Sequence, residues 1–447
     1  MKNKQTNWLG RRVIRLSPPQ VLALGFLGLI IIGGLLLKLP FSTKHPIHWV
    51  DAFFTATSAT TVTGLATVDI GSSFTFFGQI VMLCLIQLGG VGFMSVAVLI
   101  VLTLGKRIGL KQRLMIKEAL NQTSVGGVIR LVKRLLLLSA IIEGVAVVFL
   151  TMRLASDLGF WKGLYYSIFH VVAAYNNAGF SLWPDNLARY VGDPVVNIVI
   201  TLLIIIGGLG FTVLSDLWNS RDFHSLSLHS KLMIVGTVGL VIFGTVAVLV
   251  LEYNNPKTLG SLSGSDKFWA AFFQGVTPRT AGFETVNYGN MNETTILLTI
   301  FLMFIGAGSA SAGGGIKVTT FLVILLAVIA FITGKESPII FGRRIKKESI
   351  SKALAVFVVS QTFIFIAVCL LMITEKAPFL TILFEVVSAF ATAGLTMGFT
   401  PHLTIFGKLV IMFIMYSGLI GPLTIFFSLS QRKNNKVQYP SEDILTG

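Results

Sequence analysis

The stretch FTATSATTVTG, residues 54–64, runs from a phenylalanine to a glycine ten positions later and is followed by Leu65. The same layout recurs three more times along the chain, at intervals of 115, 103 and 112 residues. Because self-similarity is the sequence signature of repeat architectures, we predict a structure with approximate fourfold repetition. Four copies of one unit around a common axis form the geometry of a pore. The other copies are Phe169–Gly179, Phe272–Gly282 and Phe384–Gly394.

The composition indicates a polytopic membrane protein. Hydrophobic residues make up 54% and charged residues 12% of the 447 residues, far from the averages of soluble domains. Eight apolar segments are long enough to cross about 30 Å of hydrocarbon, and one phenylalanine-to-glycine unit lies between the members of each consecutive pair. These segments lie near residues 20–39, 74–103, 131–153, 192–214, 231–252, 294–333, 353–374 and 404–429.

The net charge of +16 raises the alternative of a nucleic-acid-binding protein. The distribution of the charge argues against it, because 24 of the 35 Lys and Arg residues fall in five regions that alternate with regions holding most of the acidic residues. This alternation follows the positive-inside rule and predicts that both termini are cytoplasmic. The basic regions are residues 1–17, 104–134, 215–231, 334–352 and those after 430.

The apolar part of each phenylalanine-to-glycine unit is too short to span a bilayer and suits a re-entrant helix. Irregular backbone at membrane depth must border protein or water, so we expect the four glycine ends to converge on a wet centre, where the negative helix ends favour a cation. The predicted fold is an all-α polytopic membrane protein with four tandem repeats of outer helix, pore loop and inner helix, in pseudo-fourfold symmetry around one pore. The predicted repeats are residues 1–103, 104–218, 219–333 and 334–447, the last with a cytoplasmic C-terminus.

Glycine loops 1 to 4, the four residues that end each unit, suit a dehydrated alkali cation. Rings of backbone carbonyls replace a hydration shell without adding net charge. Glycine permits the positive φ angles that turn successive carbonyls inward, and the small residue before it lets four strands approach. A single loop would be interpreted as a turn or a helix contact, whereas four equivalent loops favour a cation filter. The loops are Thr61-Val62-Thr63-Gly64, Asn176-Asn177-Ala178-Gly179, Arg279-Thr280-Ala281-Gly282 and Ala391-Thr392-Ala393-Gly394.

The chain resembles the Trk/Ktr/HKT superfamily of potassium transporters, most closely its Ktr-type (KtrB-like) membrane subunits. The resemblance covers almost the whole chain, from Pro18 to Thr424. Its most specific stretches are ATTVTGL at 59–65, YNNAGF at 175–180, VTPRTAGF at 276–283 and GAGSA at 306–310.

The resemblance implies that the four loop glycines belong to a selectivity filter whose carbonyls hold K⁺ as the transported ion. No cofactor bound by the chain is implied; Na⁺ is a candidate activator, and a sodium-permeable or sodium-coupled transporter of the same fold is the alternative. The resemblance also implies a homodimer gated by an octameric ring of cytosolic RCK-type nucleotide-binding subunits. The basic loops 104–134 and 334–352 would contact this ring or membrane lipid, or serve only as the topology signal.

The third inner segment is interrupted. Residues 306–315 contain five glycines, which lower helix propensity in the middle of a 40-residue apolar segment. We expect a loop beneath the filter, and the resemblance implies that it is a mobile intramembrane gate. Lys317 is either a functional cation at depth or a snorkelling side chain. Leu419 stands where the family pattern Gly-Arg-Ile-Gly-Pro has arginine. The expected gate residues are Gly306, Gly308, Gly313, Gly314, Gly315, Lys317 and Leu419.

Three further charges and two glycine clusters have structural interpretations. We expect Arg279 to hydrogen-bond near the outer mouth, Glu385 to cap the fourth short helix or form an ion pair, and Glu143 to pair with another helix. The clusters at 89–92 and 207–210 are expected to let helices pack closely.

Nothing in the sequence indicates an enzyme. The six histidines show no metal-ligand spacing on one helix, and no nucleophile with an acid–base partner can be recognised. No phosphate-binding Gly-x-x-x-x-Gly-Lys-Ser/Thr sequence occurs, so we expect ion movement to follow the electrochemical gradient. The prediction is a multi-pass transporter of a bacterial plasma membrane that binds no nucleic acid.

Overall fold

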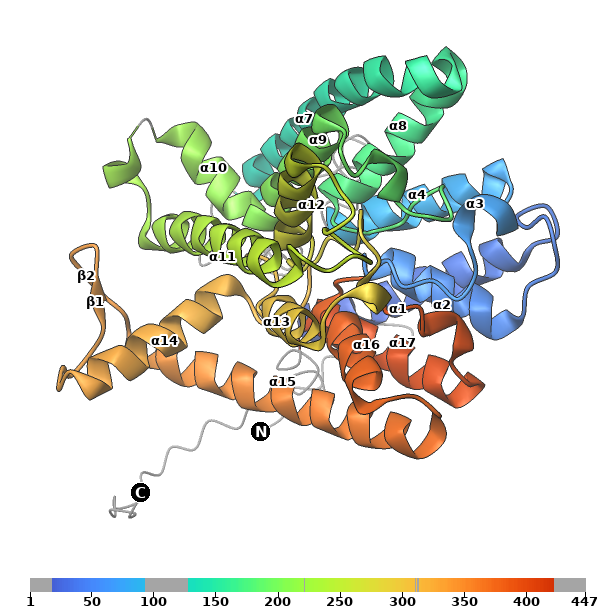
Figure 1. Cartoon of the computed structure of the whole chain (residues 1–447). Helices are drawn as coiled ribbons and strands as arrows, with labels where there is room; N and C mark the ends of the chain where they lie inside the picture. Colours follow the sequence, from blue (N-terminus) through green and yellow to red (C-terminus); the bar gives the residue numbers. More distant parts are fainter. Residues whose placement is uncertain (1–17, 93–127, 221, 310, 312, 422–447) are drawn as a thin grey trace, which may run out of the picture.

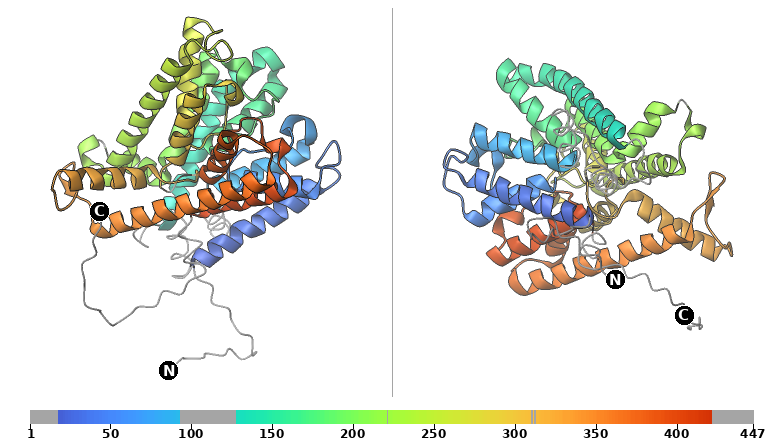
Figure 2. Two further views of the ribbon diagram at one scale, coloured as in Figure 1. Left: turned by 60° about the horizontal axis from the view of Figure 1, so that its bottom comes forward. Right: turned by 180° about the vertical axis from the view of Figure 1, so that it is seen from behind.

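The computed structural model describes residues 18–92, 128–220, 222–309, 311 and 313–421, and within these ranges the regular secondary structure is almost entirely helical. Four groups of helices follow one another around a common centre, coloured blue, green-teal, yellow-green and orange-red in Figure 1. The view from behind in Figure 2 shows the same arrangement. The predictions for the termini, most of the basic loop 104–134 and the ends of the first and fourth inner segments fall outside the described residues.

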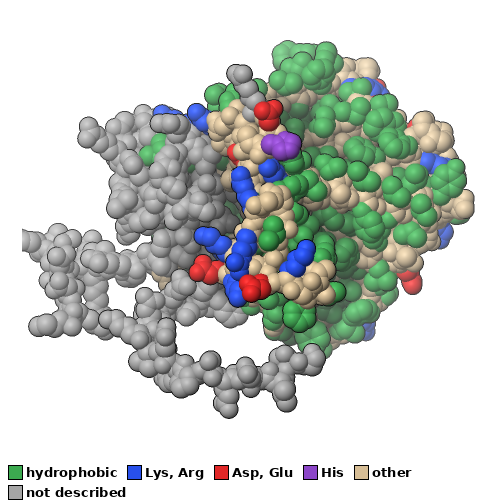
Figure 3. Space-filling model, turned by 90° about the vertical axis from the view of Figure 1, so that its left-hand side faces the viewer, with side chains coloured by type: hydrophobic (Ala, Val, Ile, Leu, Met, Phe, Trp, Pro, Cys, Tyr) green, Lys and Arg blue, Asp and Glu red, His purple; other side chains and the backbone are tan. Residues whose placement is uncertain are grey.

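Each group begins with a long apolar outer helix. Among the described residues, the four outer helices are long and apolar enough to cross a membrane. They leave large hydrophobic side chains such as Phe149 and Phe365 exposed, as expected where the surrounding medium is lipid. Apolar side chains also cover much of the face in Figure 3. The outer helices are α1 (Pro18–Lys38), α7 (Val128–Leu158), α11 (Leu228–Glu252) and α15 (Lys347–Thr374).

A short helix and then an inner helix follow each outer helix, which confirms the predicted order of elements. The short helices are α2 (Trp49–Thr60), α8 (Phe160–Tyr175), α12 (Gly264–Val276) and α16 (Phe379–Ala391). The inner helices are α4 (Phe76–Gly90), α9 (Pro194–Leu209) with α10 (Phe211–Asn219), α13 (Glu293–Phe304) with α14 (Val318–Ile332), and α17 (Ile405–Ile420).

Polar residues fix where the inner helices begin. The side chains of Thr75, Asp193 and Thr404 accept hydrogen bonds from backbone N–H groups in the first turns of α4, α9 and α17. In the third repeat this role falls to Glu252 at the end of α11, whose carboxylate accepts from the N–H of Asn292 at 2.9 Å. These caps satisfy donors that the helix itself leaves unpaired.

Within the described residues, the first helices of the inner segments end at corresponding places. A glycine with positive φ follows α4, α9 and α17 within two residues, and the third inner segment is interrupted between α13 and α14. The expected span over 192–214 is sharply bent, because α9 and α10 meet at 93° at Gly210, whose φ is +89°. The close-packing expectation is confirmed for Gly89 and Gly207, where an added Cβ would collide with the carbonyl oxygens of Thr60 and Tyr175.

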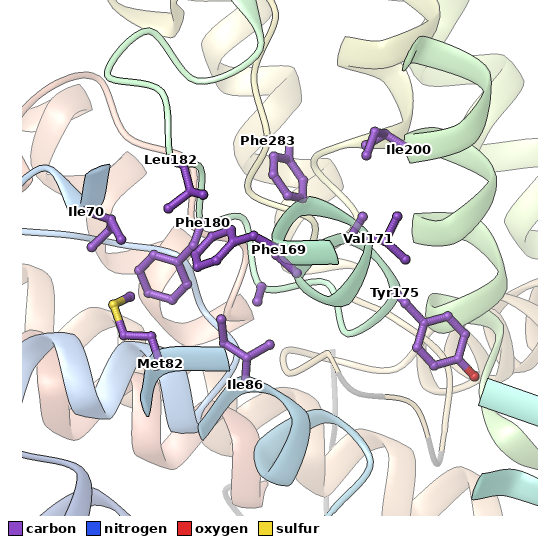
Figure 4. Close-up of a cluster of buried hydrophobic side chains, with 14 of the residues drawn as sticks. Ile70, Met82, Ile86, Phe169, Val171, Tyr175, Phe180, Leu182, Ile200 and Phe283 are labelled. Atoms are coloured by element: carbon purple, nitrogen blue, oxygen red, sulfur yellow. The ribbon is translucent and has the colours of Figure 1, made fainter. Parts of the chain in front are cut away.

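The repeats close into a circle because each inner helix packs on the short helix of the next repeat. The pairs are α4 with α8, α9 with α12, α13 with α16, and α17 with α2. Apolar side chains from neighbouring repeats fill the space between them: in Figure 4, Met82 and Ile86 of α4 lie beside Phe180, near Phe169 of α8.

Smaller elements complete the described fold. Strands β1 (Ile339–Ile340) and β2 (Arg343–Arg344) form an antiparallel hairpin between α14 and α15, at the edge of the molecule in Figure 1. One four-residue α-helix and four 3₁₀ turns lie in the connections between these helices. They are α3 (Ile70–Ser73), η1 (Ala188–Tyr190), η2 (Phe223–Ser225), η3 (Tyr288–Asn290) and η4 (Thr400–His402).

Candidate functional site

The four glycine loops share one unusual backbone conformation. In every loop the glycine and the residue two positions before it both have positive φ. Three of those preceding residues, Val62, Thr280 and Thr392, are β-branched, for which this conformation is strained by about 1–3 kcal/mol. The same positive-φ conformation in four equivalent places, strained in three of them, indicates a backbone shape held for function rather than an accident of one turn. The φ values for the preceding residue and the glycine are 56° and 99°, 58° and 65°, 71° and 74°, and 50° and 77° in loops 1 to 4.

The four glycines form a closed ring, called the glycine ring below. A Cβ added to Gly64 would lie 3.1 Å from the Cα of Gly179, one added to Gly179 would lie 2.6 Å from Gly282, one added to Gly282 would lie 3.3 Å from Gly394, and one added to Gly394 would lie 3.1 Å from Gly64. The circuit visits the repeats in chain order and returns to the first.

At each step of the ring, the missing side chain would collide with the carbonyl oxygen of the residue before the next glycine. That oxygen is 2.5 Å from the added Cβ at Gly64, 2.9 Å at Gly179 and 2.8 Å at Gly282, and the contact at Gly394 is closer still. Main-chain oxygens from four repeats therefore gather around one axis, with no room for a side chain between them. The oxygens belong to Ala178, Ala281, Ala393 and Thr63.

Comparison with known proteins agrees with this geometry. The family described as TrkH, cation transport protein, matches residues 29–437. The chain belongs to this family. It is 56% identical to the Ktr system potassium uptake protein B of Bacillus subtilis, over 100% of this chain and 99% of that protein. It is 41% identical to the Vibrio alginolyticus protein of the same name, over 96% and 95%, and 39% identical to the potassium/sodium uptake protein NtpJ of Enterococcus hirae, over 97% and 98%.

A solved structure supports the fold of this TrkH-family chain. The crystal structure of the potassium transporter TrkH from Vibrio parahaemolyticus aligns with a TM-score of 0.72 at 20% identity, covering 94% of this chain and 86% of that one. At this identity the match establishes the shared architecture. The predicted family and the predicted all-helical fold are therefore both confirmed.

In this TrkH-family member, the polar first residues of glycine loops 1 to 3 form hydrogen bonds with groups outside the ring. The Thr61 hydroxyl donates to the carbonyl of Thr57 at 2.8 Å, and the Asn176 amide donates to Gln87 of α4 at 2.7 Å. The buried Arg279 guanidinium donates to the Thr237 hydroxyl of α11 at 3.2 Å. These hydrogen bonds attach the loops to helices α2, α4 and α11.

The contact with Thr237 locates Arg279 along α11, fifteen residues or about 22 Å from the Glu252 end, where α11 meets the start of α13. The expected position near the outer mouth stays a prediction. Arg279 lies three residues after the C-terminal end of α12. A cation there is favoured by the negative end of the helix dipole.

Two pairs of polar side chains brace loops 2 and 4 at equivalent positions. The residue nine before the glycine is His170 in loop 2 and Glu385 in loop 4. The His170 ring Nε2 lies 3.1 Å from the hydroxyl of Ser181, and the Glu385 carboxylate accepts from Thr396 at 2.8 Å and also from Thr400. The predicted capping or ion-pair role of Glu385 is wrong, because this residue lies fully buried in the middle of α16.

The interruption of the third inner segment lies directly against the glycine loops. The N–H of Gly314 donates to the Thr392 hydroxyl at 2.7 Å, and a Cβ on Gly313 would collide with Thr280. Parallel bridging between Ile305 and Ile316 holds the two ends of the interruption together. The predicted break is confirmed, and it contacts the residues with positive φ in loops 3 and 4.

Five of the expected gate residues lie within this interruption, and Lys317 and Leu419 lie beside it. The Lys317 ammonium donates to the Gly313 carbonyl at 2.5 Å and so ties the loop to the start of α14 rather than reaching away from it. Leu419 follows Gly418, whose carbonyl carbon would lie 3.1 Å from a Cβ on Gly314. Gly306 and Gly308 pair through their N–H groups with the carbonyls of Ile316 and Gly208.

Proposed function

We propose that this chain is the ion-translocating subunit of a Ktr-type potassium uptake system in a bacterial plasma membrane. The observation that carries the proposal is the glycine ring, which brings main-chain oxygens from four repeats to one axis. Such oxygens replace the hydration shell of an alkali cation. The names of the relatives from Bacillus subtilis and Vibrio alginolyticus, both potassium uptake proteins, support potassium as the ion.

In this proposal K⁺ is the transported substrate and is held by carbonyls of glycine loops 1 to 4. The interruption at 306–317, with Lys317 and Leu419 beside it, is the gate beneath the ring. The repeats of the pore are residues 1–103, 104–218, 219–333 and 334–447. Movement follows the electrochemical gradient.

We further propose that the protein is a homodimer gated by an octameric ring of cytosolic RCK-type nucleotide-binding subunits, with both termini in the cytoplasm. The word system in the relatives' names supports a regulatory partner. Arg343 and Arg344 of the β1–β2 hairpin are exposed, and Lys and Arg side chains gather on one part of the face in Figure 3. This basic surface is proposed to meet the ring or anionic lipid headgroups.

The test is ion uptake in cells that lack their own potassium uptake systems. Wild type is compared with Gly282→Ser and with the matched control Gly239→Ser, at equal surface expression. At Gly282 the backbone has φ +74°, and the new Cβ would lie 2.8 Å from both Gly179 Cα and Ala393 O. A Cβ added at Gly239 would have no other residue's atoms within 4 Å. We expect potassium-selective uptake that Gly282→Ser degrades and Gly239→Ser leaves intact.

The same assay addresses sodium, which the name of the Enterococcus hirae relative includes. Uptake is measured across potassium and sodium, and potassium uptake is repeated with and without sodium to detect activation. Sodium uptake equal to potassium uptake would replace the proposal by a sodium-permeable transporter. Uptake that Gly282→Ser does not change would remove the glycine ring from the ion pathway.

A further inference from the structure

A chain of three polar side chains leads from glycine loop 2 to an outer helix. The Asn176 amide Nδ2 donates to Oε1 of Gln87 at 2.7 Å, and Nε2 of Gln87 donates to the two carboxylate oxygens of Glu143 at 3.2 and 3.5 Å. The three residues come from glycine loop 2, from α4 of the first repeat and from α7 of the second. Loop 2 is thus anchored through a neighbouring repeat.

The carboxylate at the end of this chain lies at membrane depth. Glu143 is at the middle of the 31-residue α7, fifteen residues or about 22 Å from either end of the helix. No salt bridge reaches Glu143 within the part of the chain that the structure describes. An acidic residue at such a depth is costly and marks a functional position by default.

The direction of the hydrogen bonds gives Glu143 a definite task. Asn176 uses the same Nδ2 group to donate to the Val172 carbonyl of α8 at 2.9 Å. Because Asn176 donates, Gln87 must present its side-chain oxygen to Asn176. The NH₂ group of Gln87 then faces away from Asn176 and needs an acceptor of its own. Glu143 is that acceptor. Without it Gln87 is free to turn, and its NH₂ group would then face the NH₂ group of Asn176.

The first residue of the other glycine loops is held differently. Thr61 bonds within its own segment, to Thr57 and Thr63, and Arg279 bonds to the outer helix of its own repeat. Ala391 has no polar side chain. Among the described residues at this position, Asn176 alone is anchored through a chain of two further side chains, so the orientation of loop 2 depends on groups outside the ring.

We propose that Glu143 and Gln87 are positioning residues for ion discrimination, because they fix the orientation of Asn176 and through it the carbonyls of glycine loop 2. The inference rests on the proposed function, in which those carbonyls select potassium. It assigns no ion contact to Glu143 itself. If the inference holds, substitutions at Glu143 of α7 or Gln87 of α4, outside the glycine ring, change the preference for potassium over sodium.

The experiment uses the full-length protein and two readouts: thermal stabilisation by K⁺ and by Na⁺ as a function of ion concentration, and the ratio of K⁺ to Na⁺ uptake. The variants are Glu143→Leu, Gln87→Leu and Glu143→Gln. The control is Thr151→Val, which alters a buried hydroxyl on the same helix that has no hydrogen-bond partner among the described residues. We expect both leucine variants to lower the preference for K⁺ about two- to tenfold, the worth of one hydrogen bond. Glu143→Gln keeps an acceptor oxygen and should retain most of the preference.

Each outcome has a distinct meaning. A preference for K⁺ that is unchanged in Glu143→Leu and Gln87→Leu overturns the inference, while a wild-type protein without any such preference overturns the proposed function instead. Equal loss in Glu143→Gln and Glu143→Leu also overturns the acceptor role. If Glu143→Leu does not fold, Gln87→Leu decides alone, because it removes the same link without a change of charge.

Discussion

Lys408 of α17 and Asp51 of α2 form an ion pair in which Nζ and Oδ1 are 2.7 Å apart, although 357 residues separate them in sequence. Both side chains are mostly buried. The pair joins the fourth repeat to the first, so it closes the circle of repeats where the chain itself provides no connection. The Asp51 carboxylate also lies in the first turn of α2, where the helix dipole favours a negative charge.

We predict that Asp51→Asn or Lys408→Met alone lowers the free energy of unfolding by about 2 kcal/mol, between the values of exposed and buried pairs. The double variant should recover part of the loss, because it leaves no unpaired charge. Thermal unfolding in detergent with a double-mutant cycle measures the coupling. The Arg189–Asp185 pair, exposed and within one segment, serves as the control and should show coupling near zero. Additive losses at 51 and 408 would contradict a closing role.

A second prediction concerns the hydrogen bond between Gly314 and Thr392. It links the interruption in the third repeat to glycine loop 4 across 2.7 Å in a buried setting. Thr392→Val removes the acceptor and keeps the β-branched shape. We therefore expect the interruption to leave its place more often and basal potassium flux to rise about two- to tenfold. Thr392→Ser keeps the hydroxyl and should resemble wild type. Flux measured in proteoliposomes tests this, and equal flux in the two variants would argue against a link.

The repeated units were predictable because their signals are local. A glycine at a fixed distance from a phenylalanine predicted each of the four loops. Glycine is favoured at these positions because the backbone has positive φ there. The break between α13 and α14 was likewise visible as a run of glycines with low helix propensity. Composition and segment length then sufficed for the membrane class.

What the sequence did not reveal depends on tertiary packing. The 93° bend at Gly210 was missed because a glycine within an apolar run also suits helix contacts. The direction of Arg279 depends on Thr237 of another helix. The hydrogen bonds of His170 and Glu385 could have been predicted from the sequence. Each residue bonds to a hydroxyl eleven residues later, and aligning the four units by position places these pairs at the same positions.

A third prediction concerns Leu419, at the position where the resemblance implies an arginine. It follows Gly418, which borders the interruption at Gly314. A guanidinium there would place a positive charge near the carbonyls that we propose to hold the cation. We predict that Leu419→Arg lowers basal cation flux, measured at equal surface expression, while the neutral Leu419→Gln has a smaller effect. Unchanged or higher flux in the arginine variant would contradict an electrostatic barrier at this position.

A fourth prediction concerns the brace behind glycine loop 4. The fully buried Glu385 accepts hydrogen bonds from the hydroxyls of the partly buried Thr396 and the fully buried Thr400. Glu385→Ala leaves both hydroxyls without this acceptor, so we expect a loss of about 1–3 kcal/mol in the free energy of unfolding, most of it from Thr400. Glu385→Gln keeps one acceptor oxygen and should lose less.

The effect of this brace on ion binding separates a local role from general destabilisation. Thr396 lies two residues after Gly394. Loss of its hydrogen bond to Glu385 should therefore weaken the stabilisation of the protein by K⁺, and it should also lower the stability of the protein without K⁺. Thermal unfolding with and without K⁺ measures both. Thr362→Val, which removes an exposed hydroxyl on α15 bonded within its own helix, is the control and should change neither. A Glu385→Ala protein that unfolds earlier yet gains as much from K⁺ as wild type would show that the brace supports the helix and not the loop.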